Sequence, residues 1–239
     1  MNYETQFTER QMVGREIMLF FVRKPENYQF QAGQYSLLTV PNLGFKDDRG
    51  LKRAFSIASS PLEKDLLFVV KTSDSALKRT MSEMHGGTTI TIDSPIGNLT
   101  LPDDTTTPLV FLAGGVGIAP FRSLILYASV ARTGHRITLF YSSQRPEDTP
   151  FLAELSDIAQ KDQNISVIPT MTRLSDGNGS WTGYTDRINP QMIMEECGEW
   201  QSAIYYVVGP PPMAQAMQET LRAMDVGPLR TKMELFTGY

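Results

Sequence analysis

Short apolar segments recur through the first hundred residues of this 239-residue chain, and turn-forming residues separate most of them. The segments are rich in β-branched, aromatic and aliphatic residues, which is typical of β-strands. They cover residues 16–22, 34–40, 54–58, 66–72 and 88–92, and one helical pattern covers residues 75–84. Because the strands follow one another without strand–helix alternation, the pattern predicts an antiparallel β-barrel or sandwich.

Strand and helix patterns alternate from residue 109 onward. Strand segments cover residues 109–113, 136–141, 165–170, 203–208 and 230–235, and helical patterns cover residues 118–131, 148–161, 189–196 and 212–224. This alternation predicts a doubly wound α/β domain, in which a parallel sheet carries helices on both faces. A polar, Thr-rich stretch between Pro102 and Pro108 is typical of a linker. We therefore predict two domains, residues 1–102 and residues 103–239.

The composition is that of a globular protein, with 41% hydrophobic and 20% charged residues. A formal net charge of −4 gives a nucleic-acid partner no electrostatic support. Basic residues nevertheless gather in the first domain, in one cluster of Lys46, Arg49, Lys52 and Arg53 and in another of Lys71, Lys78 and Arg79. A solvated basic surface and a phosphate-binding surface both fit these clusters.

The chain has one cysteine, Cys197, which excludes an internal disulfide and an iron–sulfur centre with its roughly four ligands. Its two histidines, His85 and His135, lie far apart in the sequence, so no metal site is predicted. The start of the chain has no apolar signal region, and no apolar run approaches the roughly 20 residues of a membrane span. These features predict a cytoplasmic protein without a membrane partner.

A glycine-rich turn, Gly114-Gly115-Val116-Gly117-Ile118-Ala119-Pro120, lies between a predicted strand and a predicted helix. Glycines there let the backbone approach a pyrophosphate, and the N-terminus of the helix favours an anion. Tight packing of the strand against the helix is the alternative reason for glycine. The turn favours nucleotide binding, with Gly115, Val116, Gly117 and Pro120 as the candidate residues.

The next strand of this domain ends in Ser142, Ser143 and Arg145. At this place NAD-binding domains often carry an acidic residue for the ribose hydroxyls, whereas an arginine accommodates a 2′-phosphate. Here Glu147 and Asp148 come only after the arginine. The order favours NADP over NAD.

The run Arg53-Ala54-Phe55-Ser56 resembles the flavin-binding signature of the ferredoxin–NADP reductase superfamily, and the glycine-rich turn resembles its nucleotide loop. The order of barrel, linker and α/β domain matches as well. The resemblance implies that Arg53 pairs with the pyrophosphate of FAD, that Phe55 lies against the isoalloxazine ring, and that Ser56 hydrogen-bonds near flavin N5. FMN is the alternative flavin, because Arg53 would serve either phosphate.

Three further segments extend the resemblance. Val69-Val70-Lys71 is similar to the strand whose backbone binds the flavin in the family, and the helix start that contains Lys78, Arg79 and Thr80 is similar to a phosphate-binding turn. Lys78 stands where the family usually has Ser. Gly209, Pro210 and Met213 belong to a loop similar to the one that faces the nicotinamide, and Val208 replaces its usual Cys.

The end of the chain, from Glu234 to Tyr239, resembles the family's Glu-x-aromatic terminus. By this resemblance Phe236 covers the flavin and moves aside for the nicotinamide, with Tyr239 as the alternative covering ring. Glu234 would relay protons near N5. A carboxylate that is merely solvated at a strand end is the other interpretation of Glu234.

The resemblance implies a flavoenzyme that takes hydride from NADPH or NADH onto FAD and passes electrons to a one-electron carrier. A ferredoxin, a flavodoxin-type carrier or an oxygenase is the expected partner. The alternatives are a reductase of free flavin or ferric complexes and a non-catalytic electron-transfer subunit that binds FAD.

Overall fold

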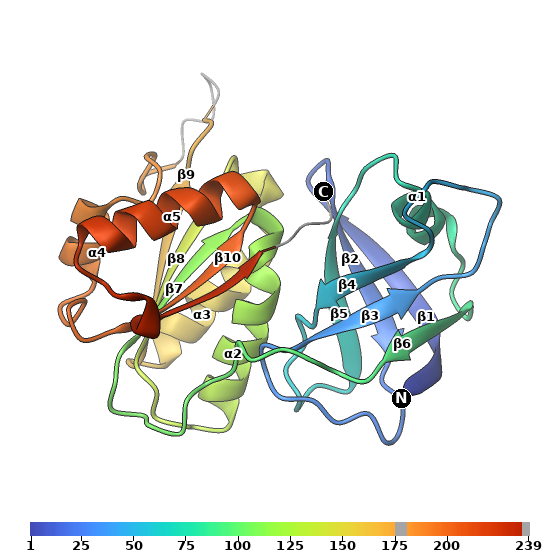
Figure 1. Cartoon of the computed structure of the whole chain (residues 1–239), viewed down its shortest axis with the longest axis horizontal. Helices are drawn as coiled ribbons and strands as arrows, with labels where there is room; N and C mark the ends of the chain where they lie inside the picture. Colours follow the sequence, from blue (N-terminus) through green and yellow to red (C-terminus); the bar gives the residue numbers. More distant parts are fainter. Residues whose placement is uncertain (175–180, 236–239) are drawn as a thin grey trace.

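The computed structural model describes residues 1–174 and 181–235. Its first half is an antiparallel sheet of six strands in the order β4-β3-β6-β1-β2-β5 (Figure 1). The strands are β1 (Asn2–Val13), β2 (Ile17–Arg23), β3 (Tyr35–Thr39), β4 (Lys52–Ser56), β5 (Asp65–Lys71) and β6 (Thr89–Asp93). A helix, α1 (Ala76–Glu83), connects β5 to β6 and adds Leu77 and Met81 to the core of this domain.

The edges of this sheet meet and close it into a barrel. Ile57, directly after β4, forms a bridge with Phe68 of β5, and the Ala58 N–H donates to the Leu67 carbonyl at 2.7 Å. Inside the barrel the rings of Phe7 and Phe20 stack with centroids 4.5 Å apart. The predicted antiparallel barrel is confirmed.

The sequence pattern does not predict β1, although this strand is 12 residues long and pairs with both β2 and β6. Only Thr5 and Phe7 of the strand are buried. Polar residues separate Phe7 from the other apolar residues of the strand, Tyr3, Met12 and Val13, so the alternation that marks a half-buried strand is too weak to detect.

The second half is a five-stranded parallel sheet in the order β11-β10-β7-β8-β9. Its strands are β7 (Leu109–Gly114), β8 (Ile137–Ser143), β9 (Ile165–Met171), β10 (Ile204–Gly209) and β11 (Thr231–Leu235). The helices α2 (Ile118–Val130) and α3 (Leu152–Lys161) cover one face, and α4 (Pro190–Glu196) and α5 (Pro211–Ala223) cover the other (Figure 1). Three short 3₁₀ helices are η1 (Gly115–Gly117), η2 (Pro146–Asp148) and η3 (Pro228–Arg230). The predicted doubly wound α/β fold is confirmed.

Most predicted elements agree with the structure to within two residues, and the helix predicted over residues 148–161 is the exception. Residues 146–148 form η2, and α3 begins only at Leu152. Phe151, between them, adopts a left-handed backbone conformation with φ 64°. A non-glycine residue in this conformation cannot continue a right-handed helix, so the helical pattern is divided there.

No helix among the described residues is long and apolar enough to cross a membrane. No group of three or more His, Cys, Asp or Glu side chains within residues 1–174 and 181–235 is arranged to hold a metal ion.

Candidate active site between the two domains

The edge strand of the parallel sheet, β11, lies on the side of that sheet that faces the barrel (Figure 1). A cavity of about 670 Å³ is lined by residues of β11 and of the barrel. Four segments line it: Tyr35 from β3, Ala54–Ser56 from β4, Gly97–Leu99 from the chain after β6, and Lys232–Glu234 from β11. This volume falls in the range of small-molecule and cofactor sites. The structure therefore brings the predicted residues Ala54, Phe55, Ser56 and Glu234 to one cavity.

Ser56 places a hydroxyl group without a partner at this cavity. The residue is 3% exposed, and its Oγ forms no hydrogen bond with any described residue. Backbone pairing with Tyr35 of β3 fixes its position. A buried hydroxyl that is left unpaired is costly, so the arrangement is suited to a bound molecule that supplies the missing partner.

Glu234 faces the cavity from the other domain. Burial raises the pKa of its carboxyl from 4.5 to about 7. A Cβ added at Gly97 would lie 3.3 Å from Glu234 Oε1 and 3.0 Å from the Tyr35 ring, so glycine at this position leaves room for both side chains. A carboxyl group with a pKa near neutrality can accept or donate a proton under ordinary conditions.

Lys232 lies two residues before Glu234 on the same face of β11, and sequence reasoning did not find it. Its ammonium group contacts the Thr100 carbonyl at 3.3 Å and the Tyr206 hydroxyl at 3.2 Å, above the Tyr206 ring. Burial lowers the pKa of this lysine. Only the tertiary structure reveals that Lys232, Tyr35 and Asn98 line the cavity, because these residues belong to no motif.

Unpaired backbone edges of β4 and β5 lie next to the cavity residues. The Thr72 N–H donates to the Glu16 carbonyl, so alternation along the antiparallel pair turns the backbone groups of Val69 and Lys71 away from β2. Likewise, the Ile57 N–H donates to the Gln34 carbonyl, so by the same alternation the backbone groups of Ser56 and Ala54 point away from β3. Beyond the Ile57–Phe68 bridge, no further strand pairing joins β4 to β5 within the described part of the chain. These edges therefore offer hydrogen bonds to a ligand.

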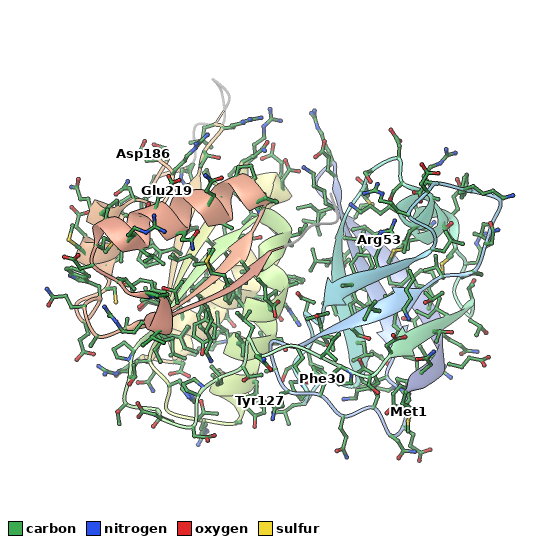
Figure 2. All side chains as sticks on the ribbon, viewed as in Figure 1. Met1, Phe30, Arg53, Tyr127, Asp186 and Glu219 are labelled. Atoms are coloured by element: carbon green, nitrogen blue, oxygen red, sulfur yellow. The ribbon has the colours of Figure 1, made fainter. Side chains whose placement is uncertain are left out.

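The predicted basic residues of the first domain surround the N-terminus of α1. Arg53 lies on β4 of the barrel (Figure 2). It donates to the carbonyls of Arg49 and Lys52 and lies 3.9 Å from the Asp47 carboxylate. Its Nη2 atom is buried and has no hydrogen-bond partner among the described residues. Asp47 also accepts from the Ala76 N–H, and chiefly this bond lowers the pKa of its carboxyl.

Lys78 is buried beside this cluster, and burial, with the charges of Arg49, Lys71 and Arg53, lowers the pKa of its ammonium group. Such a concentration of positive charge favours an anion. The other two predicted residues of α1 do not join the cluster in this way. Arg79 is exposed and lies over the Phe45 ring at 4.2 Å, whereas Thr80 is fully buried in the barrel.

The glycine-rich turn and the loop after β10 pack directly against each other. A Cβ added at Gly117 would lie under 3.0 Å from the Val208 carbonyl oxygen, and one at Gly114 would overlap Met213 Sδ. These two glycines therefore serve packing. Gly115 differs, because its φ is +53° and the space on its Cβ side is open. Packing thus accounts for Gly114 and Gly117 but not for Gly115.

The other predicted nucleotide residues lie around this turn. Val116 packs against an apolar cluster that includes Val69 of the barrel, and Pro120 is buried in the first turn of α2. Ser142 lies in β8 beside Gly114 of β7, so the turn and the end of β8 share the carboxyl edge of the sheet. Ser143 is buried and bonds the Asp148 carbonyl, while Arg145 is partly exposed.

Two predicted residues, Phe236 and Tyr239, lie outside the described residues. Gly209 and Pro210 are adjacent to Gly114, because a Cβ added at that glycine would lie 3.1 Å from Pro210 Cδ. The cavity at Ser56 and the carboxyl edge of the sheet are neighbours in space, since Glu234 pairs with Val208 at the end of β10.

Comparison with known proteins agrees with this arrangement. Residues 111–219 match the family of the oxidoreductase NAD-binding domain. The chain is 27% identical over 198 residues to the reductase component of propane 2-monooxygenase from Gordonia, covering 82% of this chain and 56% of that protein. It is also 27% identical over 195 residues to the reductase component of phenol 2-monooxygenase from Pseudomonas, covering 80% and 53%. The chain spans about half the length of the curated relatives it matches.

Solved structures share the fold over nearly the whole chain. A ferredoxin NADP+ reductase from Neisseria gonorrhoeae with bound FAD and NADP has a TM-score of 0.78 at 24% identity, covering 100% of this chain and 99% of its own. The cytochrome P450 reductase GcoB from Amycolatopsis has a TM-score of 0.82 at 20% identity, covering 98% and 70%. The chain therefore has the two-domain fold of these reductase structures, and its residues 111–219 match the family of the oxidoreductase NAD-binding domain.

Proposed function

We propose that the chain is an FAD-dependent NAD(P)H oxidoreductase. The observation that carries the proposal is the cavity in which a buried, unpartnered Ser56 hydroxyl from the barrel meets Glu234 from the nucleotide domain. The residues fit a flavin. Phe55 supplies an aromatic side, the edges of β4 and β5 supply backbone hydrogen bonds, and the basic cluster at α1 supplies positive charge for the pyrophosphate.

When it is bound, FAD supplies the hydride-accepting chemistry, and the chain positions the reactants. Arg53 binds the pyrophosphate through the guanidinium nitrogen Nη2, which has no hydrogen-bond partner among the described residues and only a 3.9 Å ion pair with Asp47. Phe55 orients the ring, and Ser56 donates from Oγ to the reacting edge. Glu234 holds a proton on its carboxyl near pH 7, where its raised pKa keeps both forms populated.

The nicotinamide nucleotide lies, in this proposal, over the carboxyl edge of the parallel sheet. Gly115 and the start of α2 contact the pyrophosphate, because no side chain caps the N-terminus of this helix. Ser142 and Arg145 contact the adenosine ribose, and Arg145 favours NADPH through its 2′-phosphate. We expect the nicotinamide to pass the loop Gly209–Met213 and reach the flavin over Glu234.

An oxygenase component is the electron acceptor that we favour. The supporting observation is that relatives matched over most of this chain are reductase components of propane and phenol monooxygenases and of terephthalate 1,2-dioxygenase. A ferredoxin- or flavodoxin-type carrier is the second candidate. Stopped-flow oxidation of the reduced chain by each class of acceptor separates the two.

The first experiment is reconstitution of the purified chain with FAD, followed by anaerobic addition of NADPH. The proposal requires a bound yellow flavin that NADPH bleaches. A chain that retains no flavin, or whose bound flavin is bleached by neither NADPH nor NADH, contradicts it.

Two substitutions test the residue roles. Arg53→Ala should weaken FAD binding at least tenfold, whereas Lys52→Ala, at the neighbouring exposed position, should change it little. Arg145→Ala should reduce kcat/KM for NADPH more than for NADH, with Lys161→Ala as a control for lost surface charge. Equal losses with both nucleotides would remove the proposed preference.

A further inference from the structure

Arg122 of α2 is an arginine whose hydrogen-bonding capacity is completely used, and it lies between the two domains. It is 6% exposed, and each of its five guanidinium N–H groups has an acceptor. Nε and Nη2 donate to Glu154 at 2.7 Å each, Nη1 and Nη2 donate to Glu63 at 2.9 and 3.1 Å, and Nη1 donates to the Ala58 carbonyl at 2.9 Å.

The two carboxylates belong to different parts of the molecule. Glu154 lies on α3, in the same domain as Arg122, whereas Glu63 and Ala58 lie in the barrel segment between β4 and β5. The Ser60 N–H donates to Glu63 Oε2 at 2.6 Å, so the barrel holds this carboxylate in place. One side of the guanidinium therefore binds within its domain, and the other side crosses to the barrel.

The crossing joins the two segments that carry the cofactor motifs. Ala58 follows Ser56 by two residues, and Arg122 follows Gly117 by five along the first turns of α2. Next to it, Ser123 Oγ donates to the Ser59 carbonyl at 2.7 Å. Apolar contacts of Ala119 and Val116 with Val69 complete this junction. The strand proposed to hold the flavin is therefore joined to the nucleotide turn by direct contacts of neighbouring residues.

Buried ion pairs are weak evidence for stability, because desolvation offsets much of their attraction, and they are better suited to selecting one arrangement. Hydride transfer requires a defined arrangement, since reacting atoms must approach to about 3–3.5 Å, and a misplacement of 1 Å costs about a hundredfold in rate. The planar guanidinium, with both edges bound and its face 4.8 Å from the Phe151 ring, fixes orientation as well as distance.

We propose that Arg122, acting through Glu63, is a positioning residue that sets the distance between the flavin and the nicotinamide and thereby the rate of hydride transfer. The proposal rests on the proposed function. Glu154 anchors the guanidinium from behind and contributes to the stability of the α/β domain.

Glu63→Gln and Glu154→Gln form a matched pair for the test. Each change removes one carboxylate from the same guanidinium and turns an amide donor toward N–H groups, but only Glu63→Gln weakens the contact between domains. We expect Glu63→Gln to slow anaerobic single-turnover bleaching of bound FAD by NADPH about 10- to 100-fold. The dissociation constants for FAD and NADPH should stay within about threefold, and the deuterium isotope effect on bleaching should persist or rise. Glu154→Gln should lower the melting temperature at least as much as Glu63→Gln does, but it should slow bleaching less than threefold.

Equal slowing by the two variants, or slowing that follows loss of bound FAD, overturns the inference. Ser123→Ala is the second test, should Glu63→Gln fail to fold, because it removes the neighbouring bond to Ser59 without changing charge. It should slow bleaching severalfold at unchanged FAD affinity, and an unchanged rate contradicts the proposal. A native chain whose flavin NADPH does not bleach refutes the proposed function instead, so the two failures are distinct.

Discussion

The substitution Glu234→Gln should stabilise the cofactor-free chain above pH 4.5, with a gain that grows until about pH 7 and then stays constant. Burial raises the pKa of this carboxyl from 4.5 to about 7. Below pH 4.5 the group is neutral in the folded and the unfolded chain. Between pH 4.5 and 7 the unfolded chain loses the proton while the folded chain keeps it, so stability falls as the pH rises. Above pH 7 the carboxyl is ionised in both states, so the loss of stability has reached its full size and no longer changes with pH.

The size of the effect follows from the two pKa values. The difference between 4.5 and about 7 corresponds to at most about 3 kcal/mol. Because Glu234 lines an open cavity and is only half-buried, solvent screening reduces this to roughly 1–2 kcal/mol. Gln has nearly the same shape as Glu and no charge. The free energy of unfolding of the variant should therefore exceed that of the native chain by roughly 1–2 kcal/mol at pH 8, which corresponds to about 2–8 °C in melting temperature. At pH 4 the two proteins should be equally stable.

Thermal unfolding of the cofactor-free chain and its variant at pH 4, 6 and 8 provides the assay. The difference between the two proteins at each pH isolates Glu234 from every other titrating group. Glu219→Gln, on the exposed face of α5 (Figure 2), is the control for the substitution itself. An identical melting temperature at pH 8 would refute the reasoning. A gain of the same size at all three pH values would also refute it, because it would arise from packing.

Substitutions at four further positions test other parts of the structure. Gly117→Ala should cost about 1–3 kcal/mol in thermal unfolding, because its Cβ meets the rigid Val208 carbonyl; Gly117→Asn should be no better, and wild-type stability would contradict this packing role. Gly115→Ala should cost about 1 kcal/mol through its left-handed backbone, and Gly115→Asn should recover most of that loss, since Asn tolerates this conformation. Ser56→Ala should leave the urea midpoint of the cofactor-free chain unchanged or raise it, because it removes an unpaired buried hydroxyl, while slowing flavin reduction; a loss above about 1 kcal/mol would show that the hydroxyl is satisfied. Phe111→Ala, at a fully buried ring of the central strand β7, should cost about 3–5 kcal/mol, and a loss below 1 kcal/mol would contradict the observed core.

The amino-acid sequence by itself determined the two kinds of domain and the order of nearly all elements. Periodicity is a local property, and a strand such as Leu109–Gly114, which is buried throughout, shows it directly in its residues. The motifs at Arg53–Ser56 and Gly114–Pro120 are also local, so the sequence by itself places the first at the end of a strand and the second between a strand and a helix. The strand β1 was not predictable from the sequence, because its burial depends on its neighbours at residues 17–23 and 89–93 rather than on its own pattern.

Only the tertiary structure decided which residues share the cavity. Ser56 and Glu234 are separated by most of the chain, and nothing local relates them or identifies Tyr35 and Lys232 as their neighbours. The same holds for the glycines of the nucleotide turn, since the loop after β10 determines that Gly117 serves packing while Gly115 is open. Arg122 is the clearest case. Along the sequence it is one polar residue of an apolar helix, and its five acceptor atoms come from two distant segments, the connection between β4 and β5 and the helix α3. The physical reason is that patterning records whether a side chain is buried, whereas hydrogen-bond partners and cavity walls are set by how distant segments pack.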